Sequence, residues 1–285
     1  MKRIRPSGPL RPLSNKGIKA TRLKSLVRPI ALLTLSALMA LTAFLIPAYA
    51  LSVNINPSNV KFIIKPGDTK NGEIFVQNSG NTSIKLKVYR EDWMFAPDGS
   101  KAFMKPGSSV YSCSNWIALD STTLDLGPKE QKSVTFSLTA PKNASGGHVS
   151  VIFFEGLIEN KKGITVSGRI GAIVYVDIEG DIKRSLDIQE ISAIGSLEGS
   201  PVSIKVVAAN KGNTYVSAIP KVTIIQDDRK ITEAVMNPVN SLPGDTTSGT
   251  VKLASPLKEG KYKAQVEMII DGKTLTSQSE FTIRK

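Results

Sequence analysis

The chain has 285 residues, 41% of them hydrophobic, which is enough for about two globular domains of ~150 residues each. Its formal net charge of +13 would suit a protein that binds nucleic acid, but residues 1–50 hold nine Lys and Arg and no acidic residue. The rest of the chain then has 28 basic and 24 acidic residues, without a dense basic run. A body so nearly balanced does not match a phosphate-binding face, and we expect no nucleic-acid partner.

An apolar run, IALLTLSALMALTAFLI at 30–46, follows the basic stretch and precedes Pro47 and the small-residue pattern Ala48-Tyr49-Ala50. This order is typical of a signal peptide. We therefore predict that residues 1–50 are a signal peptide with a long basic n-region, cut after Ala50. The long basic segment leaves an uncleaved membrane anchor as the alternative, although the run is shorter than the ~20 residues of a full span. We expect an exported protein, periplasmic or at the cell surface, that meets the membrane only through an uncleaved signal segment.

Short alternating runs bounded by Gly, Pro, Asn and Asp fill the first half of the chain after residue 50, where no helical period is found. Proline cannot donate a hydrogen bond to a sheet, so the first run is expected to lie at an edge or to be kinked at Pro57. The predicted strands span residues 52–64, 72–78, 83–93, 116–126, 133–141, 146–156 and 163–180.

The second half continues the same pattern of strands and turns. Asp271-Gly272 lies between the last two runs and is a strong signal for a two-residue hairpin loop. The predicted strands span residues 185–194, 201–210, 216–225, 248–256, 260–270 and 273–283.

The two halves also share motifs at similar spacing. Asn-x-Gly-Asn-Thr occurs as NSGNT at 78–82 and as NKGNT at 210–214, each time after a hydrophobic run, and SVTFSLTAP resembles SGTVKLASP. We predict that both copies form the same corner, with Gly80 supplying a positive φ. The predicted fold is all-β: two tandem immunoglobulin-like β-sandwich domains, at 51–181 and 182–285, after the N-terminal signal peptide.

Residues suited to catalysis or metal binding are scarce. His148 is the only histidine and Cys113 the only cysteine. Neither a Ser–His or Cys–His pair nor a set of zinc ligands is expected from them. Carboxylates distant in sequence can still pair in a fold, which keeps an enzyme open as an alternative. We expect a non-enzymatic protein with no catalytic residue, no metal and no cofactor, and a buried, inert thiol at Cys113.

One predicted strand is unusually long and regular: every even position from Ile164 to Ile178 is apolar or glycine. One interpretation is a core strand with one face packed inside. The alternative is an edge strand that completes the sheet of another protein, and both can hold along one strand. Gly168 and Gly171 are expected to bulge or bend it. The predicted partner-binding residues are Ile164, Val166, Arg169, Ile170, Ala172, Val174, Val176 and Lys183.

Four segments of the first half, INPSNVKF, REDW, LGPKEQKSVTFSL and FFE, carry a family resemblance. With the signal peptide and the long last strand, region 51–180 resembles the periplasmic pilus chaperones of the PapD type. The resemblance implies a chaperone that lends this strand to an incomplete exported subunit, while a cleft Arg and Lys hold the subunit's C-terminal carboxylate. The expected Arg of the first strand is replaced by Asn59 or Val60, and the paired Pro after FFE is missing. Arg169 and Lys183 are therefore the candidate cations.

The same pattern resembles the first domain of bacterial surface proteins with paired immunoglobulin-like domains, some of which bind peptidoglycan or neighbouring surface proteins. The leading hypothesis is a chaperone-like protein that binds exported subunits or surface proteins by β-strand addition during the assembly of a pilus or surface structure. The alternative is a structural or adhesive module that binds the cell wall or neighbouring surface proteins.

Overall fold

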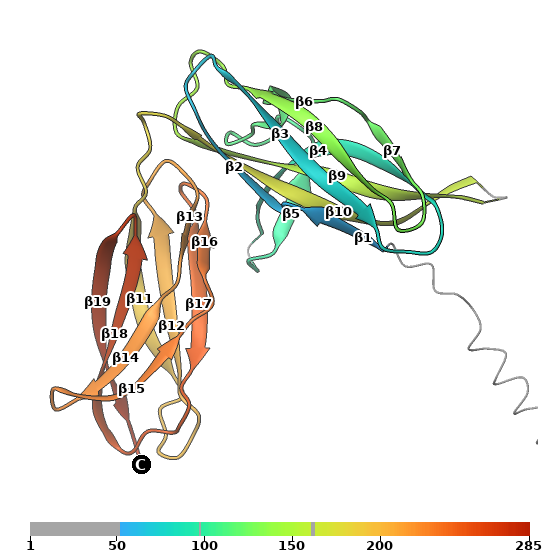
Figure 1. Ribbon diagram of the computed structural model, residues 1–285. Coiled ribbons are helices and arrows are strands. Elements are labelled where there is room, and N and C mark those ends of the chain that lie inside the picture. Colours follow the sequence, from blue (N-terminus) through green and yellow to red (C-terminus); the bar gives the residue numbers. More distant parts are fainter. Residues whose placement is uncertain (1–51, 97, 161–162) are drawn as a thin grey trace, which may run out of the picture. The chain divides into compact units, whose positions relative to one another are not determined.

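The computed structural model describes residues 52–96, 98–160 and 163–285 (Figure 1), and the side chains of 157–167 are not described. The predicted signal peptide at 1–50 lies outside these residues. In the described part, strands form two β-sandwiches in tandem, and one 3₁₀ turn, η1 (Ser114–Trp116), accompanies them. The predicted all-β fold with two immunoglobulin-like domains is confirmed.

The first sandwich is built from the strands that precede residue 179. One of its sheets has the order β1-β3-β8-β6, and the other has the order β2-β10-β9-β4, with β5 and β7 both paired to β4. The strands are β1 (Val53–Asn56), β2 (Asn59–Ile64), β3 (Thr69–Asn78), β4 (Ile84–Phe95), β5 (Lys101–Met104), β6 (Ile117–Leu119), β7 (Thr123–Leu126), β8 (Gln131–Thr139), β9 (Gly147–Asn160) and β10 (Gly163–Ile178).

The first strand of this sandwich divides between the two sheets at Pro57. Before the proline, β1 pairs antiparallel with β3, and after it β2 pairs parallel with β10. Both pieces lie at sheet edges, as a residue without an N–H requires. The predicted single strand at 116–126 is likewise two strands in different sheets, β6 on β8 and β7 on β4, so that prediction is corrected.

The core of the first sandwich is formed by side chains that alternate along its strands. Ile74 and Val76 of β3 face Leu86 and Val88 of β4, all at most 1% exposed. Each such side chain contributes about 1.5–3 kcal/mol by leaving water. The alternation of apolar side chains that predicted the strands is therefore the same alternation that places one face of each strand in this core.

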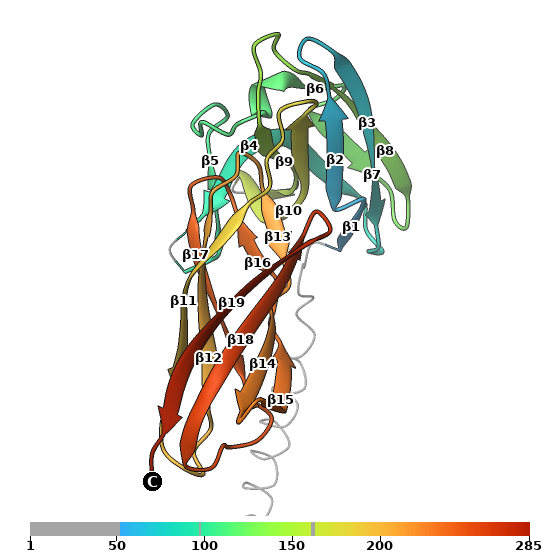
Figure 2. The same cartoon turned by 90° about the vertical axis from the view of Figure 1, so that its left-hand side faces the viewer.

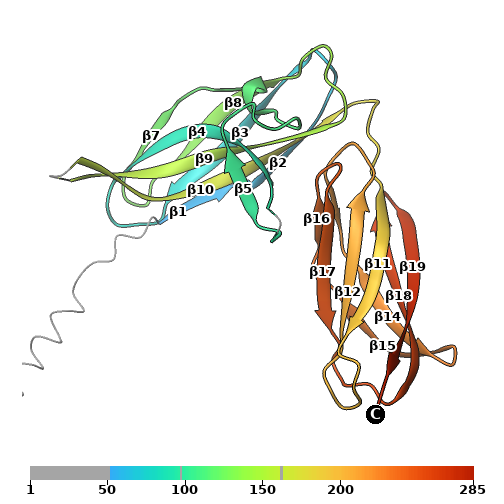
Figure 3. The same cartoon turned by 180° about the vertical axis from the view of Figure 1, so that it is seen from behind.

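The second sandwich follows the same plan with shorter sheets. Its strands form the orders β11-β12-β17, β13-β16 and β15-β14-β18-β19, of which Figure 3 shows the first sheet. They are β11 (Leu186–Ile194), β12 (Ser203–Asn210), β13 (Val216–Ala218), β14 (Lys221–Gln226), β15 (Arg229–Val235), β16 (Val239–Ser241), β17 (Thr246–Lys252), β18 (Gly260–Ile270) and β19 (Lys273–Ile283).

The predicted two-residue hairpin at Asp271-Gly272 is confirmed. Ile270 of β18 pairs with Lys273 of β19, and the two turn residues have φ of 47° and 75°. Positive φ at both positions is what a tight turn between twisted strands requires. Figure 2 shows the long antiparallel pair that this turn joins.

The two Asn-x-Gly-Asn-Thr motifs form the same corner in both sandwiches, which we name the first corner (78–82) and the second corner (210–214). Asn78 ends β3 and Asn210 ends β12. Each side chain accepts a hydrogen bond from the glycine N–H two residues on, at 2.9 Å, and donates to the threonine carbonyl four residues on. The expected positive φ of Gly80 is wrong, because neither it nor Gly212 is among the residues with positive φ.

The residues between β10 and β11, 179–185, form a segment that we name the linker. The predicted domain boundary between 181 and 182 falls within it and stays a prediction.

Candidate partner-binding site

The even-numbered side chains of β10 from Ile170 to Ile178 point into the first sandwich. Ala172, Val174 and Val176 are 0–1% exposed and belong to its core, and Ile170 is partly buried against the same core. The core interpretation of this face therefore holds for these residues. The interpretation of Ala172, Val174 and Val176 as docking side chains is corrected, because buried groups have no surface to offer a partner.

Residues 163–167, at the start of β10, belong to the part whose side chains are not described. Ile164 and Val166 belong to the strand by their backbone, which pairs with Glu159 and Leu157 of β9. The register shifts between Val166 and Gly168, which confirms the predicted bulge at Gly168, whereas the pairing with β9 continues through Gly171 without a shift. The docking role of Ile164 and Val166 stays a prediction, since their side chains lie outside the described residues.

Arg169 lies on the opposite, outer face of the strand and is already engaged. Its guanidinium is 3.1 Å from Glu91 Oε2 and donates to the Tyr89 hydroxyl at 3.1 Å. It also stacks on the rings of Phe153 and Phe103, at 4.0 and 5.1 Å from their centroids. An arginine held by an acid, a hydroxyl and two rings is a poor anchor for a further carboxylate, because binding would have to break these contacts.

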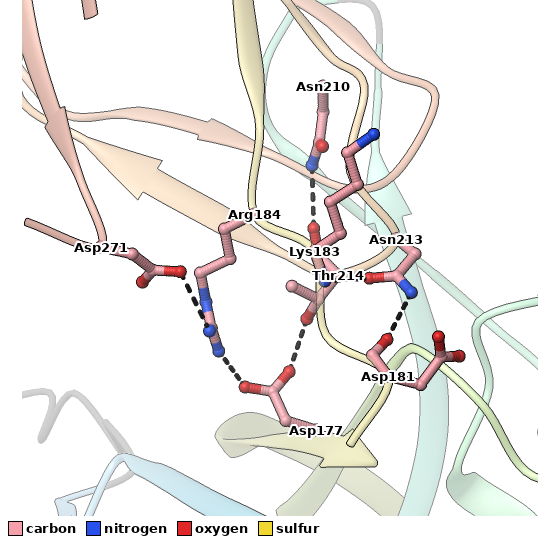
Figure 4. Close-up of polar contacts among 8 residues, drawn as sticks. All are labelled: Asp177, Asp181, Lys183, Arg184, Asn210, Asn213, Thr214 and Asp271. Carbon is pink, nitrogen blue, oxygen red and sulfur yellow. Dashed lines mark hydrogen bonds and ion pairs between the residues drawn. The ribbon is translucent and has the colours of Figure 1, made fainter. Parts of the chain in front are cut away.

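Lys183 lies in the linker and is held by its backbone. Its N–H donates to Asn213 Oδ1 at 2.7 Å, and its carbonyl accepts from the Asn213 N–H at 2.9 Å (Figure 4). The side chain is exposed. Arg169 lies on β10 and Lys183 in the linker, so the two are separate candidate cations, and the role of Lys183 stays a prediction.

The strand pairing along the outer edge of β10 changes at Ile173. From Ile173 to Ile178 the strand pairs with β2, and the Ile173 N–H donates to Ser58 O at 2.9 Å. In the described part of the chain, residues 163–172 pair with β9 alone. Backbone groups alternate sides along a strand, so Gly171 and Arg169 point their N–H and C=O groups the same way as Ile173. Residues 163–172 of β10 are thus an edge that no described strand pairs with on that side.

A cavity of about 320 Å³ lies beside the paired part of the strand. It is lined by Lys61 of β2, His148 of β9 and Tyr175 of β10, and by residues of the second sandwich. Two isoleucines at its rim are largely exposed, Ile63 at 62% and Ile269 at 67%. The cavity therefore offers apolar surface with a cation, Lys61, on the strand next to β10.

Arg184 also lines this cavity, where it is neutralised by two acids. It forms an ion pair with Asp177 of β10 and lies 3.5 Å from Asp271 of the β18–β19 turn (Figure 4). Sequence reasoning did not select Lys61, Asp177 or Arg184 as site residues. The alternating pattern shows only that Lys61 and Asp177 face away from the core, and Arg184 is one of several charges at the predicted hinge.

The lone histidine and cysteine have structural surroundings. Cys113 is fully buried, and burial, with the charge of Asp92, raises the pKa of its thiol well above the ordinary range. His148 packs on Trp116 with ring centroids 4.3 Å apart and contacts Ser145 O at 3.0 Å. Burial lowers the pKa of His148, so the ring is mainly neutral at pH 7. Nothing in either setting activates a nucleophile.

Residues 52–96, 98–160 and 163–285 contain neither a metal-binding cluster nor a membrane-spanning helix. Among them, no group of three or more His, Cys, Asp and Glu side chains could hold a metal ion. In the same residues, no helix is both long enough and apolar enough to cross a membrane. The expectations about enzymes and cofactors stay predictions.

Comparison with known proteins found similarity among solved structures only. No family model matches the chain, and no curated protein matches its sequence. The class 5 fimbriae chaperone CfaA is similar at 13% identity, covering 79% of this chain and 98% of that chain, with a TM-score of 0.45. The chaperone YadV is similar at 12% identity, with 81% and 100% coverage and a TM-score of 0.44. The E. coli chaperone DraB has 12% identity, 82% and 98% coverage and a TM-score of 0.40.

The chain is similar to these three chaperones in fold alone. With identities of 12–13% and TM-scores below 0.5, the similarity is limited to the general fold. It assigns neither a family nor a partner to this chain.

Proposed function

We propose that this protein is an exported, non-enzymatic, chaperone-like protein that binds other exported or surface proteins by strand addition. The observation that carries the proposal is the partly paired edge of β10, where β2 pairs with residues 173–178 and, among the described residues, no strand pairs with 163–172 on that side. An extended segment of a partner can pair there with the backbone groups of Arg169 and Gly171. The partner class proposed from the sequence resemblance is a subunit of a pilus or of a similar surface structure.

The local chemistry of the edge suits an incoming strand. Gly171 has no side chain and Ala172 only a methyl group, so a neighbouring backbone can approach closely. The bulge at Val166 and Gly168 ends the regular register, which gives the edge a defined start. At its other end, the edge meets β2 at Ser58, beyond which Lys61 lines the cavity. We propose Lys61, rather than Arg169 or Lys183, as the cation available to a partner.

Side-chain substitution in β10 is a poor test of this proposal. Val174→Asp would place a carboxylate at a position with 0% exposure, which costs several kcal/mol and unfolds the sandwich whether or not the edge binds anything. A change in backbone chemistry at the edge separates binding from folding.

The matched pair Arg169→Pro and Arg169→Ala provides that test. Both variants lose the contacts with Glu91 and Tyr89, but only proline also removes the N–H that faces the unpaired side. Partners are isolated with the exported protein, identified by mass spectrometry and bound again to each purified variant. Arg169→Ala should bind them, and Arg169→Pro should bind at least tenfold more weakly.

Hydrogen exchange serves as the control for folding and as a second measurement. Core amides of β9 should stay protected in both variants, and partner binding should protect the amides of Arg169 and Gly171 in the unmodified protein. Equal binding by both variants, or a partner footprint elsewhere on the chain, would overturn the proposal.

Export is proposed from the sequence pattern and is tested separately. The N-terminus of the mature protein should be Leu51, which Edman sequencing or intact mass measures directly. A protein that retains residues 1–50 in the membrane fraction would support the anchored alternative instead.

A further inference from the structure

The second corner differs from the first in what surrounds it. In the first corner, Asn81 and Thr82 are exposed, and the main-chain contacts of the corner stay within the first sandwich, at Ser52, Lys129 and Glu130. In the second corner, Asn213 is half-buried and Thr214 is buried. The same residue types in the same turn therefore occupy different environments.

Asn213 binds the linker through its backbone and its side chain. It exchanges two hydrogen bonds with Lys183, one through each of these groups, and its Nδ2 donates to Asp181 O at 2.5 Å (Figure 4). The N–H of Lys211 adds a bond to Ser185 O at 2.9 Å. Hydrogen bonds from the second corner thus fix three residues of the linker, which belongs to neither sandwich.

Thr214, the residue after Asn213, contacts the first sandwich. Its hydroxyl donates to Asp177 Oδ1 at 2.6 Å, while the other oxygen of the same carboxylate receives Arg184. Next to it, the Gly147 N–H donates to Asn213 O at 2.8 Å. A Cβ at Gly147 would lie 2.6 Å from Thr214 Cα, so glycine is what permits this approach.

Aromatic packing accompanies these polar contacts. Tyr215, the residue after the second corner, lies 4.7 Å from the Tyr175 ring and 6.4 Å from the Trp93 ring between centroids. Leu242 of the second sandwich is buried in the same cluster, with Val149 and Val151 of β9. The corner therefore brings apolar side chains of the second sandwich onto the outer face of the first.

From this juxtaposition we infer that the second corner is a latch: Asn213 holds the linker, and Thr214 and Tyr215 hold the first sandwich, so the two sandwiches move as one body. Opening the latch frees the linker while each sandwich remains folded. The first corner has the same internal turn and no latch function. This inference goes beyond the proposed function, and its test requires no partner.

The repeated motif supplies a matched control for the test. The latch variant is Asn213→Ala with Thr214→Val, and the control variant is Asn81→Ala with Thr82→Val, each in the full chain. Spin labels on cysteines introduced by Glu73→Cys and Lys273→Cys report the distance between the sandwiches, since both positions are exposed and Cys113 is buried. We expect one narrow distance distribution for the unmodified and control proteins and a distribution at least twice as wide for the latch variant.

Hydrogen exchange on the same variants separates opening from unfolding. The amides of Lys183 and Asn213 should exchange at least tenfold faster in the latch variant, while the amides of β3 and β12 keep their protection. If β12 also loses protection, Thr214→Val is compared with Thr214→Ser, which retains the hydroxyl and should restore slow exchange at the linker. A broad distribution in the unmodified protein, or a narrow one in a folded latch variant, would overturn the inference.

Discussion

The first and second corners make the same internal hydrogen bonds and differ in the neighbours of their outer residues. In both, a nearly buried asparagine, Asn78 or Asn210, ties the end of one strand to the start of the next. Only in the second do the glycine and the last two residues approach the linker or the other sandwich. The comparison teaches that the Asn-x-Gly-Asn-Thr pattern specifies a turn, while the neighbours of its outer positions decide whether the turn also holds the linker.

Removal of the buried asparagines should cause the largest loss of stability, and the loss should be similar at both corners. Asn210→Ala leaves the carbonyls of Thr214 and Ser241 without their donor, and Asn78→Ala does the same to Thr82 and Gly127. Loss of buried partners costs about 1–3 kcal/mol per group, so we expect about 3 kcal/mol in each sandwich. Hydrogen exchange of β3 and β12 measures each loss separately. A loss at one corner alone would show that the two turns are not equivalent.

Substitution of the motif glycines should separate the corners. A Cβ at Gly212 would lie 3.0 Å from Ser185 N and closer still to Lys183 O, whereas at Gly80 its nearest neighbour is Asn78 Oδ1 at 3.1 Å. Gly212→Ala must therefore push the linker away, at a cost of about 2 kcal/mol. Gly80→Ala should cost less than about 1 kcal/mol. Denaturant unfolding of the two variants provides the measurement, and equal costs would contradict the close approach at the second corner.

The carboxylate beside the second corner has no counterpart at the first. Asp177→Asn weakens the ion pair with Arg184 and keeps an oxygen for the Thr214 hydroxyl. The two charged side chains are 20% and 30% exposed, so we expect a loss of about 1 kcal/mol, smaller at high salt. Thermal unfolding at low and high ionic strength checks this. The pair Lys132–Glu130 of the first sandwich is more exposed, at 45% and 41%, and its removal should cost less.

The smallest predicted effect is a pH dependence of stability from His148, which is adjacent to Gly147 at the second corner. Burial lowers the pKa of His148 below its ordinary value of 6.5, so the unfolded chain takes up this proton before the folded protein does. The free energy of unfolding should therefore fall as the pH drops below about 6.5, until the pKa of the folded state is passed. His148→Gln should remove this slope, and an unchanged slope would assign it to the neighbouring carboxylates.

Much of this fold follows from the sequence because alternation and turn chemistry are local. The even positions of β10, the Asp271-Gly272 hairpin and the break at Pro57 each depend on neighbouring residues alone. The division of 116–126 into two strands was missed, because the choice of sheet depends on partners distant in the chain. The turn chemistry of glycine predicts a positive φ at Gly80, whereas neither motif glycine is among the residues with positive φ.

The candidate site was less predictable than the fold. Alternation located β10 but could not tell which of its halves β2 covers, since that requires the register between Ile173 and Asn59. Arg169 was selected for its charge, and its engagement by Glu91 and Phe153 depends on three strands meeting. The distinct role of Asn213 had no signal in the sequence, because NSGNT and NKGNT differ by one residue.

Parallel pairing between β2 and β10 also has a consequence for the order of folding. Asn59 and Ile173, which face each other in this pair, are 114 residues apart in the chain. Contacts of such long range form slowly, because a large loop must close before any pairing compensates for the lost entropy. The first sandwich is therefore expected to close late, after β10 has been synthesised, whereas the β18–β19 hairpin needs only its two-residue turn. During that interval the whole length of β10 on the β2 side is open to other chains, including a second copy of itself.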